Sequence, residues 1–155
     1  EPIQYLGFPL SISETFQQRN TNKSIIDALN ELEQIQNLCK KTNKTLVVYL
    51  SMGFGNPYGD PWSPEIIEKW VDQIIGIGVS IISISDTVGT AKVSDITNLY
   101  ATLIPIYPEV EFGAHFHTHP NEWYEKVHAA YFSGCFRCIG ASGLASHAHP
   151  MHGDS

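Results

Sequence analysis

The sequence predicts an α/β fold, namely part of a (β/α)8 TIM barrel in which about five parallel strands alternate with helices. Short apolar runs alternate along the chain with longer amphipathic segments, as expected for parallel strands covered by helices. Polar side chains follow nearly every predicted strand, where the loops of a barrel form its active site. An open, doubly wound sheet is the alternative. It has less support, because no G-x-G-x-x-G motif follows the first predicted strand.

The predicted elements follow one another as strand, helix and strand along the chain. Strands are predicted at residues 3–10, 46–51, 79–85, 110–117 and 136–140. Helices are predicted at residues 24–42, 64–77, 93–106 and 121–133. The first of these helices has apolar residues at spacings of three and four. Ser63 and Pro64 supply an N-cap and a first-turn proline for the second helix.

Length and composition predict one domain or a piece of one. The chain has 155 residues, of which 43% are hydrophobic, and no linker-like segment divides it. We expect residues 1–140 to form the central-to-late portion of a barrel catalytic domain, and residues 141–155 to be an atypical, His-rich and truncated end. Because the first residue is Glu1 rather than Met, we expect a fragment or a processed product of a longer protein. Five strands do not close an eight-stranded barrel, so open edges would favour association.

Charge and hydropathy argue against several classes of partner. A net charge of -7 without a basic stripe argues against nucleic acid. The sequence has no apolar run of the roughly 20 residues that span a bilayer, and residues 1–20 do not resemble a signal peptide.

Three sparse cysteines fit a reducing cytoplasm. Cys135 and Cys138 form a C-x-x-C motif, but no second pair completes a zinc site, so redox or zinc chemistry is the weaker alternative.

The strongest local motif is a pair of histidines at the end of a predicted strand. Side chains at positions i and i+2 of a strand point to the same side, so His115 and His117 present two imidazoles together. Neutral imidazoles are good ligands for divalent metals, and a carboxylate or amide from elsewhere could complete the site. The alternative is a pair of hydrogen-bonded histidines inside a barrel. His119 leaves the strand and is expected in a loop.

Two other loops carry chemistry-bearing residues. Asp86 ends a buried strand, where a carboxylate can orient a substrate hydroxyl or take a proton. The alternative is an aspartate that caps the next helix or shapes the turn. Residues 51–62 alternate glycines and prolines with aromatics, which predicts a fixed loop with close backbone approach to a ligand. A tight turn packed by aromatic rings is the alternative for that loop.

These loops resemble the hydroxymethylglutaryl-CoA lyase family, within the group of metal-dependent barrel lyases and Claisen-type synthases. The resemblance rests on Y-L-S-M-G-F-G-N-P-Y-G-D-P-W, S-I-S-D-T-V-G and G-A-H-F-H-T, in this order and each after a strand. The earlier S-E-T-F-Q-Q-R-N-T-N-K-S is similar to the family loop that precedes a barrel helix. H-x-H alone is shared with isopropylmalate and homocitrate synthases, whereas F-G-N-P-Y-G favours the lyase.

The resemblance implies cleavage of (S)-3-hydroxy-3-methylglutaryl-CoA to acetyl-CoA and acetoacetate. It implies a divalent metal, Mg²⁺ or Mn²⁺, that chelates the tertiary hydroxyl and a neighbouring oxygen. His115 and His117 would be metal ligands, His115 would also move a proton, and Asp86 would be catalytic near the hydroxyl. Three residues of the same loops are predicted to bind substrate: Asn56, Ser83 and Thr87.

The sequence also departs from the family pattern. The family's Arg-Asp pair on its first strand has no counterpart here, and in the late loop His149 stands where the family has a proton-donating Cys. The remaining metal ligands would lie outside this chain. Two alternatives therefore stay open, an acyl-CoA condensing synthase of the isopropylmalate or homocitrate type and a non-catalytic fragment. The resemblance implies an acyl-CoA partner and a homo-oligomeric full-length protein, located in the cytoplasm or, in a eukaryote, the mitochondrial matrix.

Overall fold

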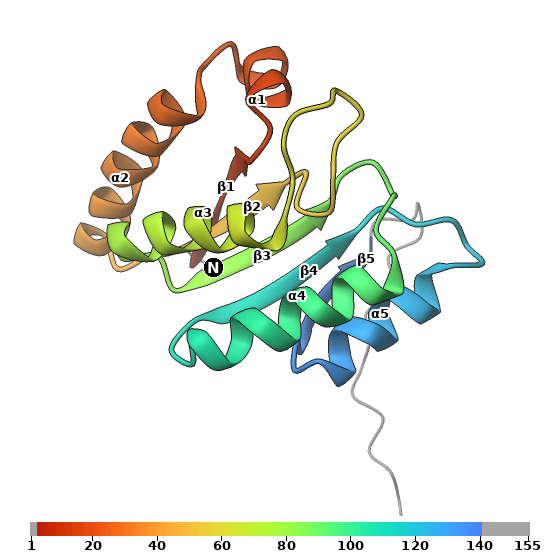
Figure 1. Cartoon of the computed structure of the whole chain (residues 1–155). Helices are drawn as coiled ribbons and strands as arrows, with labels where there is room; N and C mark the ends of the chain where they lie inside the picture. Colours follow the sequence, from red (N-terminus) through yellow and green to blue (C-terminus); the bar gives the residue numbers. More distant parts are fainter. Residues whose placement is uncertain (1–2, 141–155) are drawn as a thin grey trace, which may run out of the picture.

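Residues 3–140 are described by a computed structural model, and they form a parallel sheet with helices packed against it (Figure 1). The strands are β1 (Tyr5–Ser11), β2 (Thr45–Ser51), β3 (Ile81–Asp86), β4 (Glu111–Phe116) and β5 (Arg137–Gly140). The helices are α1 (Glu14–Thr21), α2 (Ile25–Lys41), α3 (Pro64–Ile77), α4 (Val93–Ile106) and α5 (Trp123–Phe132). The predicted α/β class and the alternation of strands with helices are confirmed.

The strands lie in the sheet in the same order as in the chain, from β1 to β5, and each neighbouring pair is parallel. Every crossover therefore moves in the same direction. Because βαβ crossovers are right-handed, a sheet wound in one direction carries its helices on one face. A doubly wound sheet reverses direction at a switch point. No reversal occurs within residues 3–140, so the open-sheet alternative is wrong for this part of the chain.

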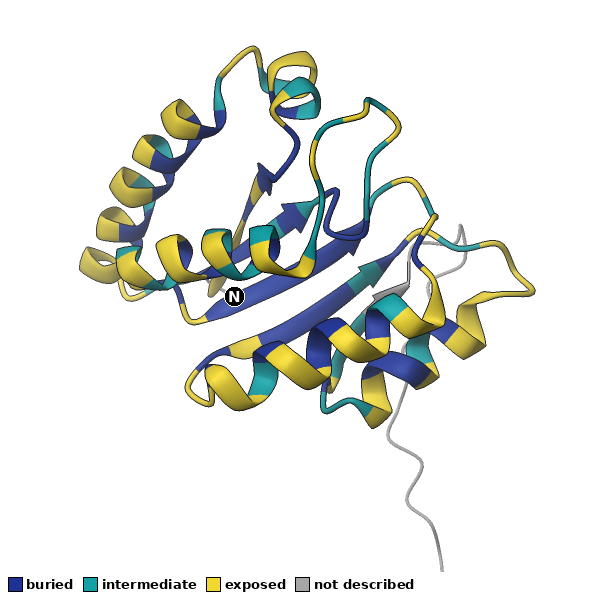
Figure 2. Ribbon diagram, viewed as in Figure 1, coloured by how far each residue is buried: buried dark blue, intermediate teal, exposed yellow. Residues whose placement is uncertain are grey.

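The two faces of the sheet have different roles. Alternate strand residues, with even numbers, form a hydrophobic core with the helices: Phe8, Leu10, Leu46, Val48, Leu50, Ile82, Ile84, Phe112, Ala114 and Phe116. In Figure 2 the strands are mostly buried, whereas the helices are exposed on the side that faces away from the sheet. The odd-numbered strand residues point to the opposite face, which we call the inner face.

The sheet is strongly curved around the inner face. The guanidinium carbon of Arg137 on β5 lies 5.7 Å from the ring centroid of Tyr5 on β1. In a flat sheet of this order the two strands would be roughly 19 Å apart, because neighbouring strands are separated by about 4.8 Å. The contact therefore requires the inner face to be concave. Consecutive strand order and this curvature together identify part of a (β/α)8 barrel.

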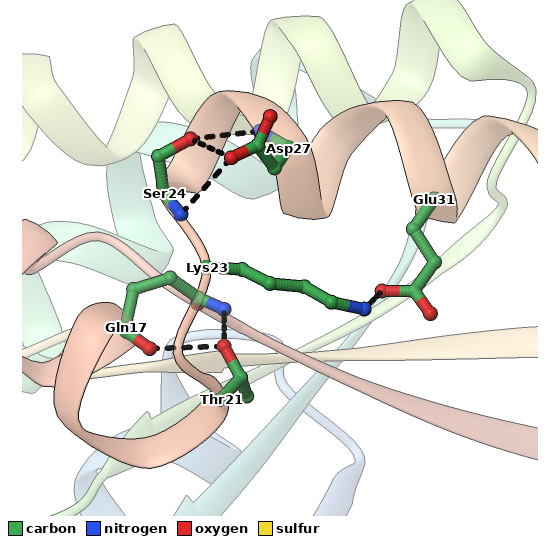
Figure 3. A network of polar contacts seen from close by, with 6 residues as sticks. All are labelled: Gln17, Thr21, Lys23, Ser24, Asp27 and Glu31. Atoms are coloured by element: carbon green, nitrogen blue, oxygen red, sulfur yellow. Dashed lines mark hydrogen bonds and ion pairs between the residues drawn. The ribbon is translucent and has the colours of Figure 1, made fainter.

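Local capping interactions explain where two of the helices begin. At α2, the Oγ atom of Ser24 accepts a hydrogen bond from the Asp27 amide at 3.0 Å, and the Asp27 carboxylate accepts one from the Ser24 amide at 3.4 Å (Figure 3). This reciprocal pair is a capping box. At α3, Ser63 caps the first turn and Pro64 takes the first helical position, as the sequence predicts.

The structure corrects the interpretation of one segment. Residues 14–21 were expected to belong to a polar loop, but they form helix α1. Ser13 caps this helix by accepting a hydrogen bond from the Phe16 amide, and Asn22 ends it in a left-handed conformation with φ 54°. A cap at each end allows a short polar segment to be helical.

Two sequence-based expectations concern the carboxyl-terminal residues and helices that could span a membrane. Residues 141–155, including His149, lie outside the described residues, so the expected His-rich end is not addressed by the structure. Within residues 3–140, no helix combines the length and the apolar character that crossing a bilayer requires.

Candidate functional site

The two histidines of the G-A-H-F-H-T segment lie together at the carboxyl end of β4. His115 is on the strand and half-buried, and His117 follows the strand and is exposed. Their ring centroids are 5.1 Å apart, with an interplanar angle of 58°. The ring of Tyr49, on β2, approaches His115 edge-on at 6.0 Å between centroids. The site thus combines side chains from different strands at the end of the sheet where barrel enzymes bind substrates.

His115 is suited to act as a metal ligand. Its Nδ1 atom is buried and has no hydrogen-bond partner among the described residues. Burial lowers the pKa of the His115 imidazole below its usual value, and the neighbouring charge of His117 lowers it further. Both effects favour the neutral form, which is the form that binds metals. Within residues 3–140, no cluster of three or more His, Cys, Asp or Glu side chains is placed to hold a metal. Among the described residues, the histidine pair therefore offers two possible ligands rather than a complete set.

Ser83 lies on the same inner face as His115. It pairs in register with Gly113, two residues before His115 on β4. Ser83 is 2% exposed, and its Oγ atom has no hydrogen-bond partner among the described residues. A Cβ atom at Gly113 would lie 3.1 Å from this Oγ atom, so the glycine leaves space beside the hydroxyl. A buried hydroxyl without a partner is uncommon and is suited to hydrogen-bond a ligand.

Asp86 is placed differently from the histidines. It pairs in register with Phe116, so its side chain belongs to the helix-covered side of the sheet. Its carboxylate accepts hydrogen bonds from the amides of Thr90 at 2.9 Å and Ala91 at 3.1 Å. It also forms an ion pair with Lys126 at 3.2 Å. The structure does not direct the Asp86 carboxylate towards the imidazoles of the histidine pair. Its contacts agree with the alternative stated from the sequence, in which Asp86 shapes the turn after its strand.

The other two predicted substrate-binding residues are held within their loops. The Asn56 Oδ1 atom accepts hydrogen bonds from the amides of Tyr58 and Asp60, both at 3.0 Å, and its Nδ2 donates to the Asp60 carbonyl at 2.9 Å. The Thr87 Oγ1 atom accepts a hydrogen bond from the Met52 amide at 2.8 Å. These contacts stiffen the two loops at the carboxyl edge of the sheet. They do not direct the amide of Asn56 or the lone pairs of Thr87 towards a ligand.

The sequence reasoning missed Tyr49 and Lys126. Tyr49 occupies the inner face of a strand that reads simply as apolar, so only the register of β2 with its neighbours reveals its position. Lys126 is 5% exposed on the buried side of α5, next to Ala129 and Ala130. A charged residue on the apolar side of a predicted helix was the available signal for it.

A sheet wound in one direction, concave on one side and carrying an imidazole pair at its carboxyl edge, is part of a (β/α)8-barrel enzyme. No family model matches the sequence. The chain is 32% identical over 108 residues to a hydroxymethylglutaryl-CoA lyase of Bacillus subtilis, a match that covers 70% of this chain and 36% of the relative. It is 24% identical over 132 residues to the (R)-citramalyl-CoA lyase of Chloroflexus aurantiacus, covering 85% and 42% of the two chains.

The structural comparison agrees with the sequence comparison. The crystal structure of the Bacillus subtilis HMG-CoA lyase superposes with a TM-score of 0.83 and 29% identity, covering 92% of this chain and 48% of that one. The chain therefore belongs to the hydroxymethylglutaryl-CoA lyase family, whose members are carbon–carbon lyases. It spans less than half the length of these relatives.

Proposed function

We propose that the protein cleaves 3-hydroxy-3-methylglutaryl-CoA to acetyl-CoA and acetoacetate. The observation that carries this proposal is the pair of adjacent imidazoles on the inner face, His115 and His117, with a buried and unpaired Nδ1 atom on His115. The relatives reported above are named as acyl-CoA lyases, which supports the lyase over the condensing synthase. An acyl-CoA substrate is part of the same proposal.

We assign Mg²⁺ or Mn²⁺ to the histidine pair. The fit rests on the unpaired Nδ1 atom, the short distance between the rings and the lowered pKa of His115. When bound, such an ion would supply Lewis-acid polarisation of the substrate hydroxyl and a neighbouring oxygen. We also propose that residues 1–140 form part of a barrel catalytic domain. The remaining metal ligands would then come from outside residues 3–140.

The protein's own side chains would then bind substrate and transfer a proton. His115, which faces the concave side of the sheet, is proposed to take up the hydroxyl proton as well as to hold the ion. Ser83 is proposed to hydrogen-bond a substrate oxygen through its unpaired Oγ atom. The predicted roles of Asp86, Asn56 and Thr87 remain predictions, and each would require its present loop contacts to rearrange or to be shared with the substrate.

The metal assignment is tested in the 155-residue chain by adding Mn²⁺ and following the paramagnetic broadening of the histidine ring signals by NMR. We expect the His115 and His117 signals to broaden first, and His117→Ala to abolish the broadening at His115. His119→Ala, which removes a nearby exposed imidazole from the following loop, is the matched control and should leave it unchanged. Equal broadening of all histidine signals would overturn the assignment.

The reaction is tested in a longer protein that contains this chain within a complete barrel. We expect such a protein to cleave 3-hydroxy-3-methylglutaryl-CoA, with release of acetoacetate, and His117→Ala to abolish the cleavage. Condensation of acetyl-CoA with a 2-oxo acid by the same protein would instead support the synthase alternative. Activity unaffected by His117→Ala would contradict the role of the histidine pair.

Two further features belong to the proposal. We propose that the full-length protein is a homo-oligomer. We also propose that it acts in the cytoplasm or, if eukaryotic, in the mitochondrial matrix. Relatives with names that specify each of these two compartments are among the matches.

A further inference from the structure

Lys126 is a buried cation that the proposed reaction does not use. Its side chain is 6% exposed on α5, and its Nζ atom contacts two acceptors. These are the Oδ2 atom of Asp86 at 3.2 Å and the carbonyl oxygen of Gly89 at 3.0 Å. Burying an ammonium group is costly unless it is paired and hydrogen-bonded, so this pair of contacts is what makes the position tolerable.

Both acceptors belong to residues 86–91, which are the last residue of β3 and most of the connection to α4; this segment is called here the β3–α4 loop. The carboxylate bound by Lys126 also accepts hydrogen bonds from the amides of Thr90 and Ala91. The amide of Gly89 donates to the backbone carbonyl of Asp86 at 3.4 Å. One cation and one carboxylate thus connect the first, middle and last parts of this loop to helix α5.

The β3–α4 loop in turn lies against the backbone of His117. The His117 amide donates a hydrogen bond to the Asp86 carbonyl at 3.3 Å. Gly89 has φ +75°, and a Cβ atom there would lie 2.9 Å from the carbonyl oxygen of His117. The loop therefore contacts both the amide and the carbonyl of the exposed histidine. Its position limits where the His117 imidazole can lie relative to His115.

We propose that Lys126 is a positioning residue for the histidine pair. Its ammonium group holds the β3–α4 loop from the helix side, and the loop fixes the backbone of His117 from the other side. The imidazole of His117 is then preorganised beside that of His115. Preorganisation of ligands by groups that do not touch the ion is a general requirement of metal sites. The consequence for metal binding rests on the proposed function, whereas the consequence for the loop does not.

The loop part of the proposal is tested by amide hydrogen exchange in Lys126→Met, which keeps an unbranched side chain one atom shorter and removes its charge. We expect roughly tenfold to hundredfold faster exchange at Gly89, Thr90, Ala91 and His117, because hydrogen bonds to charged groups are lost or weakened there. Amides in the centres of β2 and β3 should keep their wild-type rates. Lys41→Met, the same change at an exposed site on α2, is the matched control and should match wild type throughout.

Two more variants separate positioning from general destabilisation. Lys126→Arg retains a cation with several donors and should restore slow exchange at the loop and at His117. If Lys126→Met does not fold, Lys126→Gln, which retains a donor for the Gly89 carbonyl, should show the same local pattern in weaker form. Acceleration spread equally over all strands, or unchanged rates at His117, would overturn the proposal.

The link to the metal is tested with Mn²⁺ alone. The concentration that half-broadens the His115 and His117 signals should rise roughly tenfold in Lys126→Met and return towards wild type in Lys126→Arg, as is typical when groups that orient ligands are lost. If wild-type protein shows no selective broadening, the metal assignment fails while the exchange result still decides the role of Lys126. If Mn²⁺ affinity is unchanged although exchange at His117 accelerates, the loop contact stands and its effect on the metal site is refuted.

Discussion

At the scale of single residues, the side of the strand decides which predicted site residues meet. His115 and Asp86 both lie at the ends of neighbouring strands, and the sequence suggested that both point into one active-site mouth. Side chains of a strand alternate between its two faces. Because Asp86 is one position further along in register than His115, the two side chains point to opposite faces of the sheet. His115 pairs with Ser85 on the inner face, whereas Asp86 pairs with Phe116 on the helix-covered side. The sequence shows which residues end a strand but not how neighbouring strands are aligned.

Gly53 illustrates a residue whose small size is required by packing. A Cβ atom there would lie 2.3 Å from the Cγ2 atom of Ile84, a residue that is fully buried. We expect Gly53→Ala to lower the free energy of unfolding by about 1–3 kcal/mol, the usual cost of overpacking a core. Gly76→Ala is the control, because nothing lies within 4 Å of its added methyl group on α3. That change should be neutral or stabilise by up to about 1 kcal/mol. Urea denaturation measures both, and equal effects would contradict the packing argument.

Asp60 connects the loop after β2 to the start of α1. Its carboxylate accepts hydrogen bonds from the Ser13 hydroxyl at 2.5 Å and from the amide and hydroxyl of Thr15 at 3.0 and 2.9 Å. The Ser13 hydroxyl, followed by the Thr15 amide, holds the pKa of Asp60 below its usual value.

A carboxylate with a lowered pKa in the folded state stabilises the protein above its unfolded pKa, because the unfolded chain binds the proton first. This contribution is lost as the pH falls through the folded pKa. We therefore expect the free energy of unfolding to decrease below about pH 4, and Asp60→Asn to weaken that decrease. Urea titrations between pH 7 and pH 3 measure it. Glu33→Gln, on an exposed site of α2, should keep the wild-type slope.

At the scale of elements, the sequence predicted nine of the segments within about two residues and missed α1. Helix α2 and strand β3 were predictable because apolar spacing and continuous β-branched runs are local signals. Helix α1 has one buried residue, Gln17, and little periodic hydrophobicity. Besides its two end caps, the distant Asp60 carboxylate and the stacking of Phe16 on Tyr58, at 6.5 Å between centroids, stabilise this helix. Contacts between segments more than 40 positions apart are not visible in a local pattern.

The start of α2 offers a comparison between a helix cap and a surface ion pair. Ser24 forms the capping box with Asp27, and the adjacent Lys23 forms an ion pair with Glu31 at 2.6 Å (Figure 3). Ser24→Ala should reduce the free energy of unfolding by about 1 kcal/mol, because it removes an acceptor for an otherwise unpaired amide. Lys23→Ala should cost less than about 0.5 kcal/mol, because exposed ion pairs contribute little. Thermal and urea denaturation of both variants test the order, and a larger loss for Lys23→Ala would contradict it.

At the scale of the whole molecule, the alternation of strands and helices was predictable, but the direction of winding and the curvature were not. Both depend on how distant strands pair, and the contact between Tyr5 and Arg137 joins the two ends of the described chain. The site has the same limitation. The spacing of His115 and His117 is local, but the closeness of Tyr49 to that pair and of Lys126 to Asp86 follows from the assembled barrel.

The outer surface near α5 carries an exposed aromatic cluster that should make the chain associate with itself. The cluster consists of Trp123, Tyr124, Tyr131, Phe132 and Phe136, which are between 46% and 76% exposed. Phe132 stacks on His128 at 4.2 Å between ring centroids, and Tyr131 contacts Phe136 at 5.4 Å. Contiguous apolar surface of this kind is uncommon on monomeric proteins, and β5 beside it pairs with one strand only within residues 3–140.

We therefore expect sedimentation velocity to show association that increases with protein concentration, and Phe132→Glu to shift the population towards monomer. A carboxylate in the middle of the cluster would have to be desolvated in any contact between two copies, which is unfavourable. Leu38→Glu, at a residue 60% exposed on α2 and outside the cluster, is the matched control and should leave association unchanged. If both variants dissociate the chain equally, net charge rather than the aromatic cluster controls association. If neither does, the contact lies on another surface, such as the edge of β1 that no strand of residues 3–140 covers.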